Sequence, residues 1–373
     1  MKSKRIAIIA NTSWNIYNFR LGLIQFLIHH GYEVHVIAPL DEYTDKIKSF
    51  GIHFHRWLLL QKSTNPIYEF VSIIHLFKIL KVLKIDYSLN FTIKPNLYAT
   101  FLSIILDYKC INNVTGLGTM FIRQSFIFTL IRKLYAVIFN HSYHVFFQNE
   151  SDMEFFISNK WITPYKASLL PGSGVDLARF KPYEKKSSES KDEINFIMIA
   201  RLLYDKGIIE YLESAKSILL KYGNSKAKFH LMGKLETKKG LGIAEAQLQS
   251  YINENIITYH GFCENPELVM KDMDVLVLPS YREGMSKVLL EALAMGLPII
   301  TTNVPGCKEC VAENQNGFLV EPRSIDSLIR GIERMIALES QVRKKFGETS
   351  RKLAEEKFSD KIVYNAYIKI ISK

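Results

Sequence analysis

The sequence has few cysteines and no long hydrophobic run, and each shortage excludes a class of protein. Its 373 residues include four cysteines, too few for the disulfide framework of a small secreted domain. No stretch reaches the roughly 18–20 uncharged apolar residues that a membrane-spanning helix needs. The richest one, residues 121–140, is interrupted by Arg123, Arg132 and Lys133. Residues 6–10 are too short for the apolar core of a signal peptide, so we expect a cytoplasmic protein.

Clustered metal ligands are also lacking. Cys307 and Cys310 form a lone CxxC pair, and Cys110 and Cys263 lie far away in the sequence without paired spacing. A structural zinc site needs about four ligands. The cysteines therefore predict no metal site.

Positive charge is concentrated in the first half of the chain. Residues 1–180 carry a net charge of +8 and residues 181–373 one of +3, within a total of +11. The first half also holds 17 of the 23 phenylalanines. A basic half rich in aromatic residues suggests an anionic partner or a membrane surface. The alternative is a solvated basic face over a phenylalanine-containing core.

Two similar α/β patterns follow one another along the chain. Continuous apolar runs of strand length indicate strands covered on both faces, as in parallel sheets. Such a run occurs at 6–10, and further strands are expected at 33–38, 52–60, 86–90, 110–114, 194–200, 229–232, 256–259, 275–278 and 298–301. Helical patterns lie between them, at 19–30, 41–50, 68–84, 207–222 and 286–295.

This alternation predicts an α/β protein with two Rossmann-like, doubly wound parallel-sheet domains. A polar stretch at 184–192 marks the boundary. We expect an amino-terminal domain at 1–182 and a second domain at 183–355. A carboxyl-terminal helix at 356–373 is expected to pack back on the first domain. Ligands of such sheets bind at the carboxyl ends of the strands, so the site is expected in a central cleft between the domains.

Residues 279–292 form the most informative segment. It follows an expected strand, contains Glu283 and Gly284, and leads into a helix that should begin near Ser286. Unpaired backbone N–H groups at a helix start make an anion site; here they would be those of Met285, Ser286 and Lys287. Glu291 would face the same side. Two carboxylates beside such a site suit a ligand with hydroxyls and phosphates. The alternative is a helix capped by Ser286 with solvated glutamates.

Two glutamates separated by seven residues in this setting resemble the EX7E signature of retaining glycosyltransferases of family 4, which have the GT-B fold. Further segments resemble motifs of this family in the same order, namely 172–176, 200–207 and 231–233. Residues 17–20 and 115–119 resemble a narrower branch. That branch extends glycans on undecaprenyl diphosphate and includes N-acetylgalactosaminyltransferases that act on lipid-linked N-acetylhexosamines. The resemblance covers nearly the whole chain and is strongest over 195–320.

The resemblance implies a role for each matching residue. Glu283, Arg201 and Lys206 would act in catalysis, the two cations by stabilising the departing nucleotide diphosphate. The implied donor-binding residues are Glu291, Gly284, Met285, Ser286, Lys287, Gly233 and Phe262. The implied acceptor-binding residues are Asn18, Arg20, Thr115, Gly116 and Gly118.

The sequence departs from the family pattern in two places. The loop at 11–16 lacks the glycine pair that many members use against the phosphates, and Trp14 is expected to shape the acceptor site instead. Thr115 stands where many relatives have a histidine, so no side-chain base is expected there. A retaining transfer in which the leaving phosphate takes the acceptor proton does not need one.

Asp272 and Asp274 look like the DxD metal motif of the other large glycosyltransferase fold. They precede the strand expected at 275–278, which places them at its amino end. Four to five residues of strand separate them from the carboxyl end by roughly 15 Å. We therefore expect neither a metal nor another cofactor.

The expected partners are a UDP-sugar, a polyprenyl-diphosphate-linked glycan and the inner membrane surface, on its cytoplasmic face. The resemblance implies transfer of N-acetylgalactosamine or another N-acetylhexosamine in the assembly of a surface polysaccharide or glycoprotein glycan. Segments 70–84 and 121–139 combine apolar residues with cations and could lie at a membrane surface. The cations are Lys78, Lys81, Lys84, Arg132 and Lys133. The alternative is that both segments are core helices.

Three other functions fit the sequence less well. An epimerase of the same fold would lack the spaced glutamate motif, and a phosphorylase would need a much longer chain. A basic nucleic-acid-binding protein would need a recognisable binding module, and net charge alone is weak support. We therefore expect no nucleic-acid partner.

Overall fold

The computed structural model describes residues 3–61, 63, 65–116, 136–183, 193–223, 225–236 and 240–373. The chain forms two compact units, residues 1–173 with 363–373 and residues 174–362. The division lies ahead of the boundary expected after Pro182, because the intervening residues pack on the second unit. Val175 and Phe180 are part of its core, and the Val175 N–H donates to Phe358 O at 2.8 Å. The linker expected at 184–192 lies outside the described residues.

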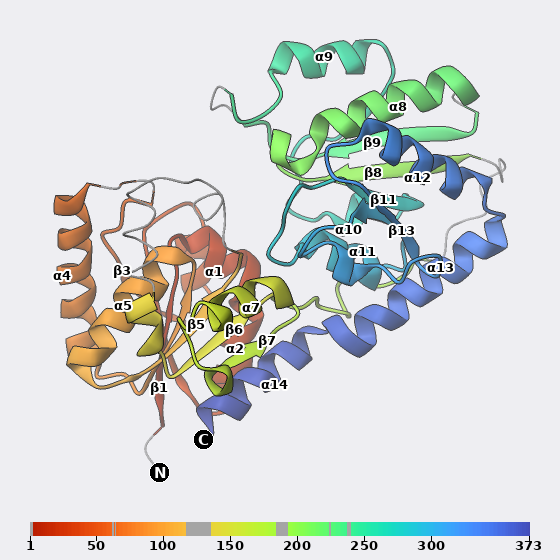
Figure 1. Ribbon diagram of the computed structural model, residues 1–373. Coiled ribbons are helices and arrows are strands. Elements are labelled where there is room, and N and C mark those ends of the chain that lie inside the picture. The colour runs from red at the N-terminus through yellow and green to blue at the C-terminus, as the bar shows by residue number, and fades with distance from the viewer. Residues whose placement is uncertain are drawn as a thin grey trace. The chain divides into compact units, whose positions relative to one another are not determined.

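The first unit is built on a parallel sheet in the order β3-β2-β1-β4-β5-β6-β7 (Figure 1). β1 lies inside the sheet, where it pairs with β2 on one side and with β4 on the other. The strands are β1 (Arg5–Ile9), β2 (Glu33–Ala38), β3 (His53–Arg56), β4 (Tyr87–Phe91), β5 (Lys109–Val114), β6 (His144–Phe147) and β7 (Ala167–Leu169). β1, β2, β4, β5 and β6 are buried on both faces along most of their length, whereas the edge strands β3 and β7 are partly exposed.

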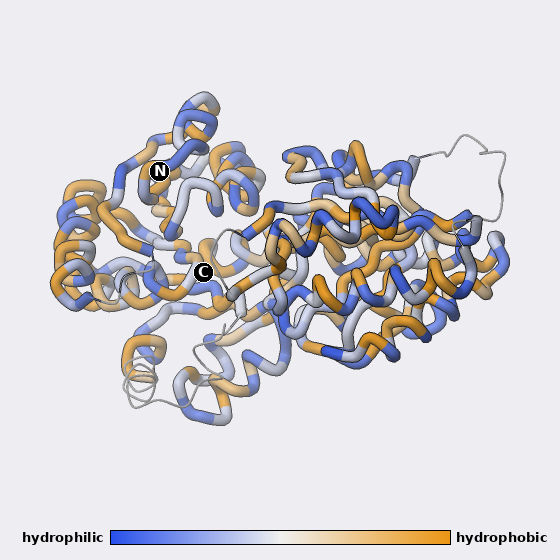
Figure 2. The backbone as a smooth tube through the Cα atoms, turned by 90° about the horizontal axis from the view of Figure 1, so that it is seen from above, coloured by the Kyte–Doolittle hydropathy of each residue, from blue (hydrophilic) through white to orange (hydrophobic). Residues whose placement is uncertain are grey.

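Helices cover both faces of this sheet. One face carries α1 (Ser13–Phe19), α2 (Leu21–His29), α3 (Thr44–Lys48) and α14 (Asp360–Ile371), whose apolar residues share one core cluster with the strands. The other carries α4 (Pro66–Leu83), α5 (Ile93–Leu106) and α7 (Glu150–Ser158). Along most helices hydrophobic and hydrophilic residues alternate, as expected when one side of a helix is buried (Figure 2).

The carboxyl-terminal helix α14 belongs to the first unit from Val363 onward. Val363, Tyr367 and Ile371 are fully or almost fully buried in its core. Gly22 of α2 lies directly against Tyr364, where a Cβ atom would come within 2.1 Å of the tyrosine oxygen. The residues from Val363 to the end of the chain therefore complete the core of the first unit.

The second unit repeats the same topology in a parallel sheet of order β10-β9-β8-β11-β12-β13. Its strands are β8 (Ile194–Ile199), β9 (Ala227–Met232), β10 (Thr258–Tyr259), β11 (Val275–Leu278), β12 (Ile299–Thr302) and β13 (Gly317–Val320). Its helices are α8 (Ile208–Tyr222), α9 (Glu245–Asn253), α10 (Glu267–Met270), α11 (Lys287–Ala294), α12 (Ile325–Ala337) and α13 (Ser340–Leu353). α8, α9 and α12 pack on one face, and α10 and α11 pack on the other.

The two doubly wound parallel sheets confirm the expected fold class. The expectation of a cleft between the domains stays a prediction. No helix in the part of the chain that the structure describes is long and apolar enough to cross a membrane.

The loop expected at 11–16 is wrong, because helix α1 already begins at Ser13. The Thr12 hydroxyl accepts a hydrogen bond from the Asn15 N–H at 2.9 Å and caps the helix. The helix expected over 19–30 is divided at Arg20, whose backbone is not helical. The strand expected over 52–60 is also shorter, since β3 ends at Arg56.

Candidate active site

The candidate site of the second unit lies where its strand order reverses. β8 and β11 are neighbours at the centre of the sheet, and the helices that follow them leave in opposite directions along the strand order. In doubly wound sheets, ligands bind outside the carboxyl ends of the two strands at this switch point. The segments that follow β8 and β11 contain Lys206 and Glu283, so both motifs predicted from the sequence reach this edge.

An ion pair joins the two motifs. Lys206 Nζ lies 2.7 Å from Glu283 Oε1. The Ser280 hydroxyl donates to the same carboxylate oxygen at 2.8 Å. The two charged side chains are 16% and 17% exposed, so the pair is shielded from bulk water but remains open to a ligand. An ammonium group has three donors, which leaves Lys206 able to bind a phosphate while it holds Glu283.

Close backbone packing fixes the distance between these two loops. Gly207, which follows Lys206, has φ +75°, and a Cβ atom there would lie 2.2 Å from the carbonyl oxygen of Pro279. Any larger residue would push the Lys206 loop away from the Glu283 loop. The Tyr281 N–H donates to Asp205 O at 2.9 Å and adds a direct link between them.

Gly306 supports Glu283 from the other side, and the sequence reading did not identify it. Its φ is +82°, and a Cβ atom would come within 2.5 Å of the carbonyl oxygen of Glu283 and 2.7 Å of its Cβ. The Glu283 N–H donates to Pro305 O at 3.2 Å. The Pro-Gly pair after β12 was the available sequence signal, since such a pair marks a tight turn.

Tyr281 and Glu210 form a second contact that the sequence reading missed. The tyrosine hydroxyl donates to Glu210 Oε1 at 2.5 Å, which ties the Glu283 loop to the first turn of α8. Burial and this carboxylate raise the pKa of Tyr281. Glu210 and Tyr281 are far apart in the sequence, so no local pattern reveals their contact.

Helix α11 begins at Lys287, close to the expected start, with Ser286 at its N-cap position. The expectation of three unpaired N–H groups is wrong for Ser286, whose N–H donates to Gly306 O at 3.0 Å. The turn after β12 reaches this loop and supplies the acceptor. The Ser286 side chain makes no capping bond, so it leaves the first-turn N–H groups to other acceptors. Gly284 and Met285 lie between Glu283 and this helix start.

Glu291 is buried, with 7% of its surface exposed. Its Oε1 lies 3.6 Å from Lys287 Nζ. Burial raises the pKa of Glu291, and the Lys287 and Arg179 cations oppose that rise. Because the side chain is buried and Glu283 is ion-paired, the alternative of solvated glutamates is wrong.

The remaining donor residues also lie at carboxyl ends of strands. Arg201 follows β8 and is exposed, and its side chain has no hydrogen-bond or ion-pair partner in the described parts of the chain. Gly233 follows β9, and its N–H donates to Gly261 O at 2.8 Å. Phe262, next to Gly261, is 58% exposed. The structure thus places Arg201, Gly233 and Phe262 at the same sheet edge as Glu283.

The metal ligands that the sequence offers include a carboxylate that is hydrogen-bonded at the amino edge of the sheet and two buried thiols. Asp274 directly precedes β11, and its Oδ2 accepts the Asn195 N–H at 2.8 Å. This is the amino edge of the sheet, as the sequence predicts. Cys307 and Cys310 are buried and not disulfide-bonded. Burial raises the pKa of the Cys307 thiol to about 12, which disfavours the thiolate that binds metals.

The described acceptor residues lie at the carboxyl edge of the first unit's sheet. Asn18 is on α1, after β1, and its Nδ2 donates to Trp14 O at 2.9 Å. Arg20 is only 4% exposed. Thr115 and Gly116 directly follow β5. Three residues with predicted roles, Gly118, Arg132 and Lys133, lie outside the described residues.

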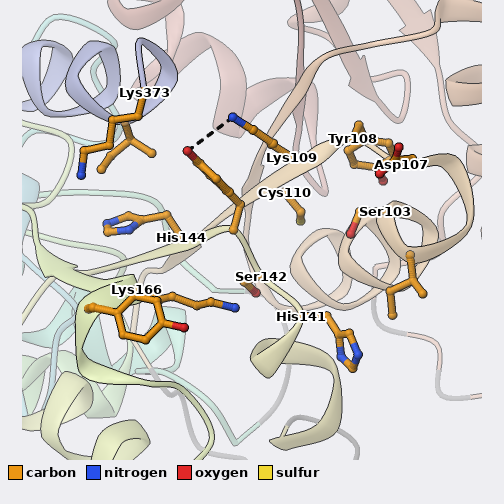
Figure 3. Close-up of a pocket in the computed structure, with 14 residues that line it drawn as sticks. Ser103, Asp107, Tyr108, Lys109, Cys110, His141, Ser142, His144, Lys166 and Lys373 are labelled. Carbon is orange, nitrogen blue, oxygen red and sulfur yellow. Dashed lines mark hydrogen bonds between the residues drawn. The ribbon is translucent and has the colours of Figure 1, made fainter.

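A cavity of about 540 Å³ lies at the opposite, amino edge of the first sheet. It is lined by Lys109, the first residue of β5, and by His144, the first residue of β6 (Figure 3). Lys109 Nζ already donates to tyrosine hydroxyls, and Lys166 Nζ donates to a backbone carbonyl at 2.9 Å. Burial lowers the pKa of His144 to about 4, so it is neutral near pH 7. The chemistry expected from the motifs is therefore not in this cavity.

Two family models match this chain. The model described as "Glycosyl transferase 4-like" matches residues 5–149, and the one described as "Glycosyl transferases group 1" matches residues 180–353. Together they span most of the chain, and each falls largely within one of the two units.

Two relatives illustrate the similarity. N,N'-diacetylbacillosaminyl-diphospho-undecaprenol alpha-1,3-N-acetylgalactosaminyltransferase of Campylobacter jejuni is 27% identical over 99% of this chain and 98% of its own length. UDP-Gal:alpha-D-GlcNAc-diphosphoundecaprenol alpha-1,3-galactosyltransferase of Escherichia coli is 26% identical, with 85% of this chain and 84% of its own covered.

Solved structures support the fold. A glycosyltransferase from Rickettsia africae has a TM-score of 0.79 at 16% identity, with 100% of this chain and 99% of its own covered. HepE of Anabaena, solved in complex with UDP and glucose, has a TM-score of 0.75 at 15% identity, with 99% of both chains covered. The chain is therefore a glycosyltransferase with the two-domain GT-B fold, whose first unit matches the 4-like family and whose second unit matches the group 1 family.

Proposed function

We propose that the protein transfers a sugar from a UDP-sugar to an undecaprenyl-diphosphate-linked saccharide with retention of configuration. The observation that carries this proposal is the Lys206–Glu283 ion pair at the switch point of the second unit. The names of the full-length relatives, which act on diphosphoundecaprenol-linked sugars, support the acceptor class. They also support N-acetylgalactosamine or a related sugar as the transferred group.

The proposed reaction breaks the bond between the sugar C1 and the UDP oxygen and forms one from C1 to an acceptor hydroxyl oxygen. The acceptor proton passes to the departing β-phosphate of UDP, so no side-chain base is needed. Negative charge grows on that phosphate as the bond breaks. Lys206 and Arg201 would stabilise this charge, which lowers the barrier because their contacts strengthen in the transition state.

Glu283 and Glu291 would bind the sugar and nucleoside hydroxyls, which donate well to carboxylates. Glu283 is held in place by Lys206, Ser280 and the Gly306 turn. We also propose that no metal takes part. The two cations can supply the charge that a metal would otherwise bring, and Asp274 is bonded at the amino edge.

We further propose that the first unit docks on the membrane that holds the lipid-linked acceptor. Helix α4 buries Ser72, Leu76 and Leu80 against the core. Its opposite side exposes an apolar and basic stripe, made by Ile67, Phe70, Val71, Ile74, Lys78, Lys81 and Val82. These residues recur at helical spacing. Lys84, just past the helix, is also exposed. Such a face suits an interface with anionic headgroups. The alternative of a core helix fits only the side of α4 that carries Ser72, Leu76 and Leu80.

The experiment that tests the function is a donor and acceptor panel. Purified protein is incubated with UDP-sugars and undecaprenyl-diphosphate-linked monosaccharides, and products are identified by mass. We expect a mass gain of one sugar with at least one pair, and loss of that gain in Lys206→Met. A panel in which every pair leaves the acceptor mass unchanged would contradict the proposal.

A further inference from the structure

Buried polar atoms without partners are concentrated at one edge of the first unit. Within the described residues, eight buried side-chain nitrogen or oxygen atoms have no hydrogen-bond partner. Five of the eight belong to residues at the end of β4 or shortly after β1 or β4. They are Asn15 Oδ1, Arg20 Nε, Asn90 Oδ1, Thr92 Oγ1 and Asn96 Oδ1.

These residues lie at the topological switch point of the first sheet. β1 and β4 are adjacent, and the chain order reverses between them. This is where a doubly wound sheet binds a ligand. Because buried polar groups in folded proteins are nearly always paired, five unpaired ones together indicate that a ligand supplies their partners.

Arg20 defines the charge of that ligand. Its guanidinium lies over the Phe91 ring, 3.9 Å from the ring centroid, and no carboxylate pairs with it among the residues described. Burial lowers the pKa of Arg20 to about 10. A buried cation without a counter-ion is unfavourable, so an anion that bonds to Arg20 would relieve a cost already present in the free protein.

The asparagines define the rest of the ligand. Asn96 Nδ2 donates to Asn113 O at 2.8 Å, and Asn90 Nδ2 donates to Asn112 Oδ1 at 2.9 Å. These bonds fix which end of each amide points into the protein, and they leave the two Oδ1 acceptors without a donor. Hydroxyl or acetamido groups of a sugar are donors of the required kind.

The backbone of Thr92, at the same edge of the sheet, has an unusual conformation. Its φ is +75° and its ψ is 167°, a region that a β-branched residue rarely adopts. Strained residues of this kind cluster where ligands bind. The Thr92 hydroxyl has no partner in the protein, so the strain is not explained by a bond that the hydroxyl makes there.

We propose that Asn15, Arg20, Asn90, Thr92 and Asn96 form a subsite for a glycosyl phosphate, with Arg20 on the phosphate and the others on the sugar. The inference rests on the proposed function, because it assigns this ligand to the sugar-phosphate part of the lipid-linked acceptor. It extends that function by adding Asn15, Asn90, Thr92 and Asn96, which no motif indicated, and by giving Arg20 a phosphate to bind.

The first test measures binding by calorimetry without any UDP-sugar. The probes are N-acetylglucosamine 1-phosphate and undecaprenyl-diphosphate-linked N-acetylglucosamine in detergent. We expect Arg20→Gln to weaken both at least ten-fold and to leave UDP affinity unchanged, because Arg20 belongs to the first unit and the residues proposed to bind UDP belong to the second. Unchanged binding of both probes, or no binding to the wild type, would overturn the subsite. Weakening of the soluble probe alone would overturn its assignment to the lipid-linked acceptor.

A second pair of variants keeps the proposal falsifiable if Arg20→Gln folds poorly. Thr92→Val preserves the β-branched shape and removes a hydroxyl without a partner. Thr163→Val is the matched control, since its hydroxyl is also buried and unpaired but lies outside the subsite. We expect three- to ten-fold weaker binding in Thr92→Val only. Equal effects of the two substitutions would overturn the subsite.

The two proposals fail separately. If the wild type binds both probes through Arg20 but transfers no sugar to any acceptor, the proposed function is wrong. If it transfers sugar but binding does not depend on Arg20 or Thr92, only the subsite is wrong.

Discussion

Gly306 offers the sharpest structural test of the Glu283 site. Gly306→Ala would place a Cβ atom 2.5 Å from the Glu283 carbonyl oxygen, well inside van der Waals contact. The Ala would also occupy φ +82°, which costs an L-residue roughly 1–2 kcal/mol. Relief of the clash must move the backbone of Glu283, because the contacting atoms are its carbonyl oxygen, its carbonyl carbon and its Cβ.

Gly31→Ala is the matched control for the backbone conformation. Gly31 has φ +83°, and nothing lies within 4 Å of a Cβ atom there. Both substitutions should therefore lower Tm by about 2–4 °C for each kcal/mol of strain. Only Gly306→Ala should displace Glu283, and a misplacement of about 1 Å at a reacting centre can lower kcat by about 100-fold.

The assay compares kcat for sugar transfer with Tm from thermal unfolding in the three proteins. We expect Gly306→Ala to lose 10- to 100-fold in kcat, and Gly31→Ala to lose stability without a comparable loss of kcat. A Gly306→Ala variant with wild-type kcat would refute the argument that this turn positions Glu283.

Four further predictions concern the charges of the protein. Arg201→Ala should weaken UDP binding about ten-fold or more by calorimetry, since a charge-assisted hydrogen bond is worth about 1.5–3 kcal/mol; unchanged affinity would remove Arg201 from the site. Burial raises the pKa of Glu291, so its ionised form costs the folded state free energy at neutral pH, and this cost disappears as pH falls through the folded-state pKa. Donor KM should rise on acidification in the wild type and lose this pH dependence in Glu291→Gln, whereas identical KM profiles would contradict the assignment. Lys78→Glu with Lys81→Glu should release the protein from anionic liposomes at low salt with UDP binding intact; equal sedimentation would count against the α4 face. Turnover should survive EDTA, and activity that disappears and returns with manganese or magnesium would contradict metal independence.

Much of the fold could be predicted from local patterns. The strand at 275–278 and the helix that begins near Ser286 were predicted closely, because continuous apolar runs and helical spacing are properties of neighbouring residues. The start of α1 is not predicted, because the local pattern places its capping residue Thr12 in a loop. The unit boundary was placed too late because residues 174–182 pack on a core assembled from distant parts of the chain.

Only those residues of the candidate site that lie in a sequence motif could be predicted. Glu283 and Lys206 lie in recognisable segments, and the structure pairs them. The contacts of Gly306 with Glu283 and of Glu210 with Tyr281 depend on which strands are neighbours in the sheet. For the same reason the N–H of Ser286 could not be known to have a partner before the turn after β12 was placed beside it.

The anomeric configuration of the product is the most direct test of retaining sugar transfer. Purified protein, one accepted UDP-sugar and an undecaprenyl-diphosphate-linked N-acetylhexosamine are incubated, and the new linkage is examined by proton NMR. We predict an α-linked product from an α-linked donor, with one UDP released for each sugar transferred. A β-linked product, or release of UDP without a new glycosidic bond, would contradict it.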